Sequence, residues 1–312
     1  MHVTMTLNPA VDVTWQVRDV LRIGAVHAVG QETRTPGGKG LNVAKMLAAQ
    51  GREVVAGGLV GQNQADWFSS MLRSMGVTPR LLSVDHDTRT NVMVTGADGR
   101  EMKFNQSGFP DLEPDWPCLQ KYLQSLVSGC SVAVFSGSLP ARFPSDTYAR
   151  IMEPFLKAGC AVALDTAGEA LVRAARHPGL ILKPNRDELS GWIGQPLTDD
   201  ASLISAVRAL SARHEIVMVS DGSVGAYFAQ GRTVWLARAP DVRAVDTTGA
   251  GDALLGQFCS DYFPDRKLTE ACMARAVAAG AAACEQYGTP LPDIARIAEL
   301  SAYVSVERVA SD

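Results

Sequence analysis

The chain has 312 residues, 46% of them hydrophobic and 20% charged, which is the composition of a folded globular protein and excludes a disordered or fibrous one. Its 29 basic and 33 acidic residues give a net charge of −4 without a basic run, so we do not expect nucleic acid as a partner. The six cysteines lack metal-binding spacing, and no apolar run approaches the roughly 20 residues that span a bilayer. The amino-terminal residues look like a first strand and not like a signal peptide. These features predict a cytoplasmic protein with free thiols and no membrane partner.

The first part of the chain is rich in strand signals. Val11, Val13, Trp15 and Val17 alternate with polar residues, the period of a strand with one wet face. The expected elements are strands at 1–7, 11–17 and 24–33, a helix at 41–50, a strand at 53–60 and a helix at 63–75.

A change of pattern follows between residues 88 and 106. Two short β runs, 90–95 and 100–104, flank Ala97-Asp98-Gly99, which is a hairpin signal. Together with the strands at 11–17 and 24–33 they predict a small separate sheet, built from about 11–35 and 88–106 and placed as a lid.

Helices and strands then alternate to the end of the chain, which predicts an α/β protein whose central sheet is mostly parallel and covered by helices on both faces. We expect one domain over residues 1–312. The elements are helices at about 115–127, 145–157, 168–176, 186–192, 200–212, 268–285 and 291–302, strands at about 131–136, 160–165, 180–183 and 215–219, and a hairpin at about 226–237.

Two glycine-rich turns, 37–42 and 246–252, each precede a helix. Small residues at a helix N-terminus let backbone N–H groups converge on an anion. Asp252 would lie beside the second of these turns. The alternative for both turns is an ordinary helix start, in which Asp252 interacts favourably with the helix dipole and Lys39 is exposed to solvent. The first turn does not fit the P-loop pattern.

Six motifs, in this order and spacing, resemble those of the PfkB-type carbohydrate kinases of the ribokinase superfamily. They are Asn8-Pro9-Ala10-Val11-Asp12, Gly37-Gly38-Lys39-Gly40-Leu41-Asn42, Ser136-Gly137-Ser138-Leu139-Pro140, Lys183-Pro184-Asn185-Arg186-Asp187-Glu188, Ser220-Asp221-Gly222-Ser223-Val224-Gly225 and Asp246-Thr247-Thr248-Gly249-Ala250-Gly251-Asp252. The resemblance spans essentially the whole chain and implies a ribokinase-like three-layer fold with a small β-sheet lid.

The resemblance also implies catalytic and nucleotide-site roles. Asp252 would be the general base, and Gly249, Ala250 and Gly251 would form the anion hole. Glu188 would hold Mg²⁺ through water, although Asn185 and Glu188 also have the spacing of a helix-capping box. Asp246 matches a loop where members of this superfamily bind K⁺. The residues that would contact ATP are Lys183, Asn185, Ser220, Gly222, Gly225 and Thr248.

On the sugar side, the resemblance assigns hydroxyl binding and positioning to Asp12, Gly38, Lys39, Asn42 and Ser138. Arg89 and Lys103 flank the predicted hairpin and would face the cleft if it closes as a lid, and two cations there suggest a substrate that already carries a phosphate. The alternatives are a solvated strand residue for Asp12 and solvated edge-strand charges for the two cations.

The opening Thr6-Leu7-Asn8-Pro9-Ala10-Val11-Asp12 is similar to the 1-phosphofructokinase and tagatose-6-phosphate kinase branch, and residues 104–109 are closest to the former. This branch implies an ATP- and Mg²⁺-dependent transfer to fructose 1-phosphate. The alternatives are a 6-phosphofructokinase, a tagatose-6-phosphate kinase, a non-catalytic sugar- or nucleotide-binding regulator and, more weakly, a dinucleotide-dependent oxidoreductase. The stripe of apolar residues on the 11–17 strand would suit a homodimer through the lid, or would pack on the main domain.

Overall fold

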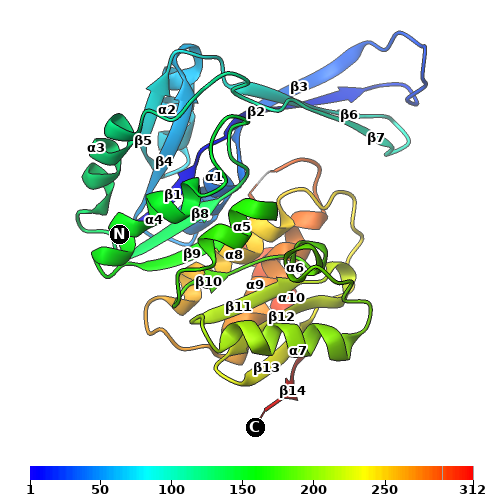
Figure 1. Ribbon diagram of the computed structural model, residues 1–312. Helices are drawn as coiled ribbons and strands as arrows, with labels where there is room; N and C mark the ends of the chain where they lie inside the picture. Colours follow the sequence, from blue (N-terminus) through cyan, green and yellow to red (C-terminus); the bar gives the residue numbers. More distant parts are fainter. Residues whose placement is uncertain (290, 312) are drawn as a thin grey trace.

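Two β-sheets organise the chain, which a computed structural model describes over residues 1–289 and 291–311 (Figure 1). Over these residues the large sheet has ten strands in the spatial order β14-β13-β12-β11-β10-β9-β8-β1-β4-β5. Neighbours from β11 to β5 are parallel, and β12, β13 and β14 add antiparallel pairs at one end. The strands are β1 (His2–Thr6), β4 (Val54–Gly61), β5 (Thr78–Val84), β8 (Val132–Ser136), β9 (Ala161–Asp165), β10 (Ile181–Leu182), β11 (Ile216–Ser220), β12 (Gly225–Gln230), β13 (Thr233–Arg238) and β14 (Val306–Ala310).

Helices cover both faces of the large sheet, because its strands are apolar on both sides. One core cluster joins α1, α2, α8 and α9 to one face, and α10 packs behind α9. The opposite face carries α3, α4 and α5, with α6 and α7 toward the β11–β13 end. The helices are α1 (Lys39–Ala49), α2 (Ala65–Ser74), α3 (Trp116–Val127), α4 (Thr147–Lys157), α5 (Gly168–Ala174), α6 (Arg186–Ile193), α7 (Asp200–Ser211), α8 (Ala250–Tyr262), α9 (Glu270–Cys284) and α10 (Ile294–Ser301), with 3-10 turns η1 (Gln62–Gln64) and η2 (Gly222–Val224).

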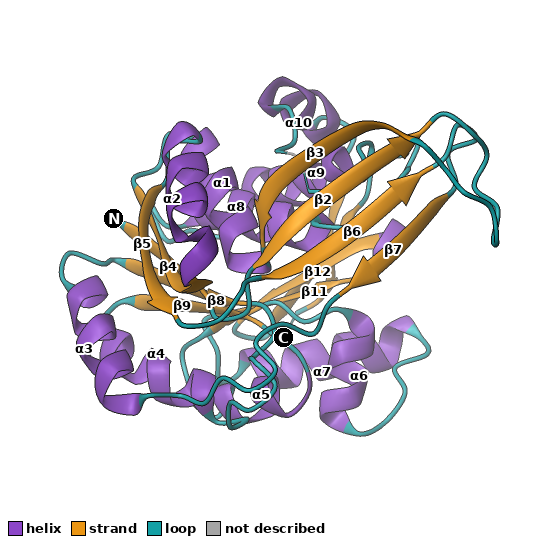
Figure 2. Cartoon of the chain, turned by 90° about the horizontal axis from the view of Figure 1, so that it is seen from above, coloured by secondary structure: helices purple, strands orange, loops and turns teal. Residues whose placement is uncertain are grey.

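The second sheet, here called the small sheet, has the order β3-β2-β6-β7 and extends away from the main body in Figure 1. Figure 2 shows its strands from above. They are β2 (Ala10–Val17), β3 (Val29–Gly37), β6 (Arg89–Thr95) and β7 (Glu101–Asn105). Because β2 pairs with β6 in parallel, Asp12 lies beside Asn91 and both side chains lie on the same face of the small sheet.

The structure differs from the sequence prediction at three strands. β3 is shifted from the expected 24–33 and runs through Pro36 to Gly37, which is tolerated because β3 is an edge strand. β5 was not expected. Pro79 is its second residue, and more and less exposed residues do not alternate cleanly along it. β14 was also missed, because its middle residues Glu307 and Arg308 are exposed.

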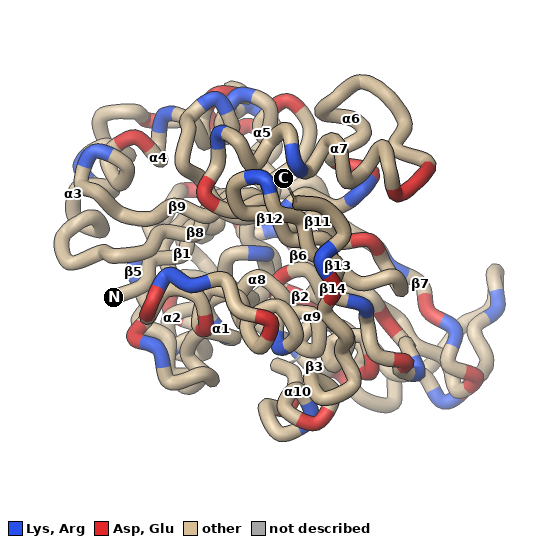
Figure 3. The backbone as a smooth tube through the Cα atoms, turned by 90° about the horizontal axis from the view of Figure 1, so that it is seen from below, with Lys and Arg blue, Asp and Glu red and all other residues tan. Residues whose placement is uncertain are grey.

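Charges are mixed over the molecule: Lys and Arg lie among Asp and Glu along the whole tube in Figure 3. Among the described residues, no helix is long and apolar enough to cross a membrane.

Candidate active site

One cavity of about 820 Å³ lies between the small sheet, the carboxyl ends of the parallel strands and the N-termini of α1 and α8. Carboxyl ends of parallel strands are the usual ligand sites of open α/β sheets. With two exceptions, Ser138 and Asp246, the predicted site residues all line this cavity. The cavity therefore brings together side chains that are up to 240 positions apart in the chain, from Asp12 to Asp252.

The start of α8 forms one wall of the cavity. Gly249, the residue before the helix, has φ +79°, a left-handed conformation that favours glycine. Gly251 lies so close to Lys183 that a Cβ atom added to it would stand 3.0 Å from the lysine Nζ. The first amides of a helix have no acceptors in an earlier turn, so those of Gly251 and Asp252 can point to an anion. The lysine and these amides thus converge on one side of the cavity.

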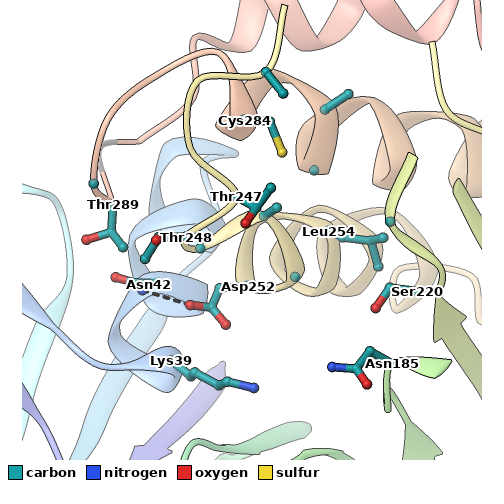
Figure 4. A pocket seen from close by; sticks show the side chains of 18 of the residues that line it. Lys39, Asn42, Asn185, Ser220, Thr247, Thr248, Asp252, Leu254, Cys284 and Thr289 are labelled. Carbon is teal, nitrogen blue, oxygen red and sulfur yellow. Dashed lines mark hydrogen bonds between the residues drawn. The ribbon is translucent and has the colours of Figure 1, made fainter. Parts of the chain in front are cut away.

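Asp252 is the buried carboxylate of this wall, with 5% of its surface exposed. Its Oδ2 accepts a hydrogen bond of 2.7 Å from the Asn42 Nδ2, which joins α1 to α8 (Figure 4). Burial, together with the nearby charge of Asp165, raises the pKa of Asp252 to about 6, although Lys39 and the Asn42 hydrogen bond act in the other direction. A carboxylate with this pKa can take up a proton near neutral pH.

Asp165, which sequence reasoning missed, holds the two lysines of the site. It is the last residue of β9 and fully buried, and its Oδ1 lies 3.2 Å from the Lys39 Nζ and 3.4 Å from the Lys183 Nζ. Burial opposes ionisation, but the two lysines outweigh it and keep the pKa of Asp165 below its usual value. The charge of Asp165 in turn raises the pKa of Lys39. Both ammonium groups are thus fixed at the cavity floor.

Asn185 and Glu188 form the capping box that was one of the two expected alternatives. The Asn185 Oδ1 accepts from the Glu188 amide at 2.7 Å, and the Glu188 Oε2 accepts from the Asn185 amide at 2.8 Å. Both residues also line the cavity, and Figure 4 shows the Asn185 side chain across from Lys39. The cap leaves Glu188 with a second carboxylate oxygen, so the capping role and a metal-binding role do not exclude each other.

The far end of the cavity is apolar. Its walls include Val242, Leu254, Val277, Ala281 and Cys284, beside the Ser220 and Gly222 turn that follows β11. Such a wall next to a polar floor suits a ligand with one flat apolar end and one charged end.

Asp12 lies on the small sheet and faces the cavity. Its Oδ1 accepts from the Asn91 Nδ2 at 2.9 Å, and its Oδ2 accepts from the Thr289 Oγ1 at 3.2 Å. Burial raises the pKa of Asp12 despite these bonds. The buried Lys45 donates to the backbone carbonyls of Pro36 and Thr289, and burial lowers its pKa to about 8. Lys45 was also not predicted, because its position in the sequence of α1 gives no sign of the buried polar contacts that it makes.

Arg89 joins the start of β6 to two loops. It donates to the carbonyls of Asn8, Pro9 and Gln106 at 2.9–3.2 Å. A guanidinium has five N–H groups, so these bonds leave two for a ligand. Ser138 is set back from the cavity, where its hydroxyl accepts from the Asn8 Nδ2 at 3.1 Å.

Lys103 and Asp246 were expected in separate roles, but they contact each other. The Lys103 Nζ lies 2.6 Å from the Asp246 Oδ1 and 3.0 Å from the Thr248 Oγ1. Asp246 is buried behind the turn and does not line the cavity.

The chain is similar to known proteins over most of its length. Residues 5–295 match the family model described as pfkB family carbohydrate kinase. A 1-phosphofructokinase of Xanthomonas campestris pv. campestris is 37% identical over 284 residues, 88% of each chain, and one of Escherichia coli strain K12 is 31% identical over 305 residues, 97% of each chain. The solved structure of phosphofructokinase-2 from Escherichia coli in complex with potassium superposes with a TM-score of 0.88 at 25% identity, over 96% of this chain and 98% of that one.

These matches confirm the expected ribokinase-like α/β fold with its small separate sheet, and they confirm the resemblance on which the sequence interpretation rested. The chain is a phosphotransferase with an alcohol group as acceptor, and it belongs to the pfkB family of carbohydrate kinases.

Proposed function

We propose that this kinase transfers the γ-phosphoryl group of ATP to fructose 1-phosphate and produces fructose 1,6-bisphosphate and ADP. The observation that carries the proposal is the buried Asp252 at the start of α8, opposite the two lysines held by Asp165. The names of the curated relatives support the choice of sugar. Phosphoryl transfer depends on positioning and on fixed positive charge, which this arrangement provides.

In the proposed reaction Asp252 takes the proton of the acceptor hydroxyl, and Asn42 holds the carboxylate in place. The hydroxyl oxygen forms the new bond to the γ-phosphorus, and the bond from that phosphorus to the bridging oxygen of ADP breaks. The amides of Gly251 and Asp252 at the start of α8, together with the Lys39 and Lys183 ammonium groups, would stabilise the negative charge on the transferred group. The Ala250 amide, expected in the same role, donates to the Thr247 carbonyl instead. Asp12 would bind sugar hydroxyls at the other end of the cavity.

ATP and Mg²⁺ are the proposed cosubstrate and cofactor. The apolar end of the cavity would take the base, with Asn185, Ser220, Gly222, Gly225 and Thr248 around the nucleotide. Mg²⁺ is commonly held by one or two carboxylates, water and the substrate phosphates. Glu188 fits this demand, because its second oxygen is not used by the helix cap. Bound Mg²⁺ would neutralise phosphate charge during the transfer.

K⁺ fits the expected site poorly. The charge of Asp246 is already matched by the Lys103 ammonium, which contacts its Oδ1. The same Oδ1 accepts from the amide and hydroxyl of Thr248, and Oδ2 accepts from the amide of Gly288.

For the sugar phosphate we propose Arg89, through the two N–H groups that remain after its three backbone contacts. Replacing Arg89 with Ala should raise the KM for the phosphorylated sugar by about 10- to 100-fold, as expected for the loss of a charge-assisted contact of roughly 1.5–3 kcal/mol. The KM for ATP should change little. Steady-state kinetics with each substrate varied checks this, and thermal unfolding of the variant controls for the lost loop contacts. An unchanged KM for the sugar would leave Arg89 a purely structural role.

A panel of phosphosugars with ADP detection tests the function. Fructose 1-phosphate, fructose 6-phosphate and tagatose 6-phosphate are compared at equal concentration, and the Asp252→Asn variant serves as the blank. The highest kcat/KM should belong to fructose 1-phosphate. A preference for either of the other sugars would assign the alternative activity, and no ADP with any ketose phosphate would reject the kinase function proposed here.

We also propose a homodimer through the outer face of the small sheet, which is the side away from Asp12. Phe104 on this face is 57% exposed, and it lies beside Val92 on the neighbouring strand. Ile23 and Val26, in the loop between β2 and β3, are fully exposed. Exposed apolar side chains gathered in one region are typical of an interface.

A further inference from the structure

We propose that the Lys103 ammonium is the built-in counter-ion of Asp246, and that it acts as a positioning residue which fastens the small sheet to the anion-hole turn. Turnover by this chain should then need no added monovalent cation. The proposal deepens the proposed function and rests on it, because the turn that Lys103 fastens is the one that leads to Asp252.

The first observation is that Lys103 has no hydrogen left for a substrate. An ammonium group has three N–H donors. Acceptors for all three are within reach: the Asp246 Oδ1 at 2.6 Å, the Thr248 Oγ1 at 3.0 Å and the Glu101 Oε1 at 2.9 Å. The expected role of Lys103 in binding the sugar phosphate would require breaking this arrangement.

The second observation concerns Asp246, whose side chain is fully buried. A buried carboxylate needs a positive partner or several donors to stay ionised. Lys103 supplies the charge, and the amides of Thr248 and Gly288 supply further donors at 2.9 and 2.8 Å. A monovalent cation at Asp246 would meet the lysine ammonium as a like charge beside a carboxylate whose charge is already matched, so the lysine occupies the role that such an ion would have.

The third observation is that the contact joins parts far apart in the chain. Lys103 belongs to β7 of the small sheet, and Thr248 immediately precedes the left-handed Gly249 that opens α8. A second contact also joins the small sheet to the main body: the Tyr287 hydroxyl, in the loop after α9, donates to the carbonyl of Gly99 at the tip of the β6–β7 hairpin. Movement of the small sheet would therefore pull on the turn that shapes the anion hole.

The experiment compares the unsubstituted chain with Lys103→Met, Asp246→Asn and the double variant. Lys103→Met should lower kcat by about 10- to 100-fold, the loss expected when a reacting group is misplaced by about 1 Å, while KM for the phosphosugar stays near the original value. A raised KM for the phosphosugar with unchanged kcat would return Lys103 to substrate binding and overturn the proposal. Because the two residues act as one unit, the double variant should lose no more than the worse single variant, whereas multiplied losses would mean independent roles.

The control variant is Arg100→Met, on the same hairpin, where the Arg100 guanidinium pairs with the carboxylate of Asp98 at the surface. It should keep the original kcat, and a loss equal to that of Lys103→Met would assign the effect to the hairpin in general. The unsubstituted chain is also assayed in potassium and in tetramethylammonium chloride at equal ionic strength. Equal rates are expected, and a rate that rises with potassium overturns the counter-ion assignment.

Urea unfolding of the unsubstituted chain, Lys103→Met, Asp246→Asn and the double variant gives a readout that needs no substrate. Lys103→Met and Asp246→Asn should each lower the unfolding midpoint, and the double variant should unfold close to the single variants. Additive shifts would show that the two residues are not coupled. If the unsubstituted chain phosphorylates none of the sugars, the proposed function fails while this measurement still decides whether the ion pair exists.

Discussion

Asp165 and Asp252 lie with Lys39 and Lys183 at the end of the large sheet, where the pKa of each carboxyl group depends on the charges around it. Asp165 is ionised because it has two lysine partners, and it therefore makes the second ionisation, that of Asp252, harder. Two carboxylates in different environments can take different roles for this reason. Asp165 holds cations, whereas Asp252 is left able to exchange a proton.

Replacing Asp252 with Asn keeps the size of the side chain and removes the carboxylate proposed as the base. We expect kcat to fall by about 10²- to 10⁴-fold, the usual contribution of a general base, while the nucleotide still binds. Coupled ADP detection gives kcat, and calorimetry with a non-hydrolysable ATP analogue gives the Kd. Glu270→Gln is the matched control, an exposed acid in the first turn of α9 that should leave kcat unchanged. Near-normal turnover by Asp252→Asn would show that Asp252 is not the general base.

The raised pKa of Asp252 predicts an acidic limit of activity. The base acts in its ionised form, and burial holds its pKa at about 6, above the ordinary value of 3.8. The fraction of active enzyme should therefore fall as pH drops through about 6, approaching a tenfold loss of kcat/KM for each further pH unit. A profile of kcat/KM between pH 5 and 8, in buffers of constant ionic strength, checks this assignment. A midpoint near 4 would mean that Asp252 is not desolvated in the free enzyme.

At the scale of elements, α1 and α8 must approach closely for Asn42 to reach Asp252. Gly256 makes this approach possible: a Cβ atom added to it would lie 2.6 Å from the Cβ of Met46 and 2.9 Å from its Cγ. Met46 is buried in turn, so it has little room to move. The hydrogen bond at the site therefore depends on a glycine one helical turn further along α8.

Gly256→Ala should cost about 1–3 kcal/mol of unfolding free energy, because the added methyl group overpacks the helix contact. It should also lower kcat, since the two helices would separate at the Asn42–Asp252 bond. Gly191→Ala is the control, in a helix where an added Cβ meets nothing within 4 Å, and it should be neutral or stabilising. Urea unfolding and steady-state kinetics measure both effects. Equal stabilities of the two variants would contradict the close contact.

One face of the small sheet lines the cavity, and the opposite face is the one proposed above for a homodimer. If the outer face forms the dimer, Phe104→Glu should shift the protein from dimer to monomer, because a charge would be buried without a partner. Light scattering after size-exclusion chromatography measures the mass. Tyr303→Glu is the control, an apolar-to-charged change at a residue that is 72% exposed on another part of the molecule. A protein that is already monomeric before substitution would contradict the dimer proposal.

Much of this architecture could be predicted from the sequence, because local patterns carry it. The β-α alternation, the individual strands of the small sheet and the two glycine-rich turns are each encoded by residues close together in the chain, whereas the pairing of β2 with β6 is not. Asp165 and Lys45 could not be assigned in this way, since their importance comes from partners such as Lys183 and Thr289 that the fold brings to them. Asp165 did carry one signal, a carboxylate at the last position of an apolar strand before a helix.

The pairing of Lys103 with Asp246 lay beyond any local pattern. The two residues are 143 positions apart, and each has a plausible separate role when seen alone. The fold places β7 of the small sheet beside the turn before α8, and this placement brings the lysine to the carboxylate.

The 210 positions between Asn42 and Asp252 also separate them in time during synthesis. At about 5–20 residues per second, a ribosome makes the residues proposed to bind the sugar roughly 10–40 seconds before the proposed base. A chain that is released early would carry Asp12, Lys39 and Asn42 but no group to accept the proton. Premature termination should therefore leave an inert fragment and not an enzyme that wastes ATP.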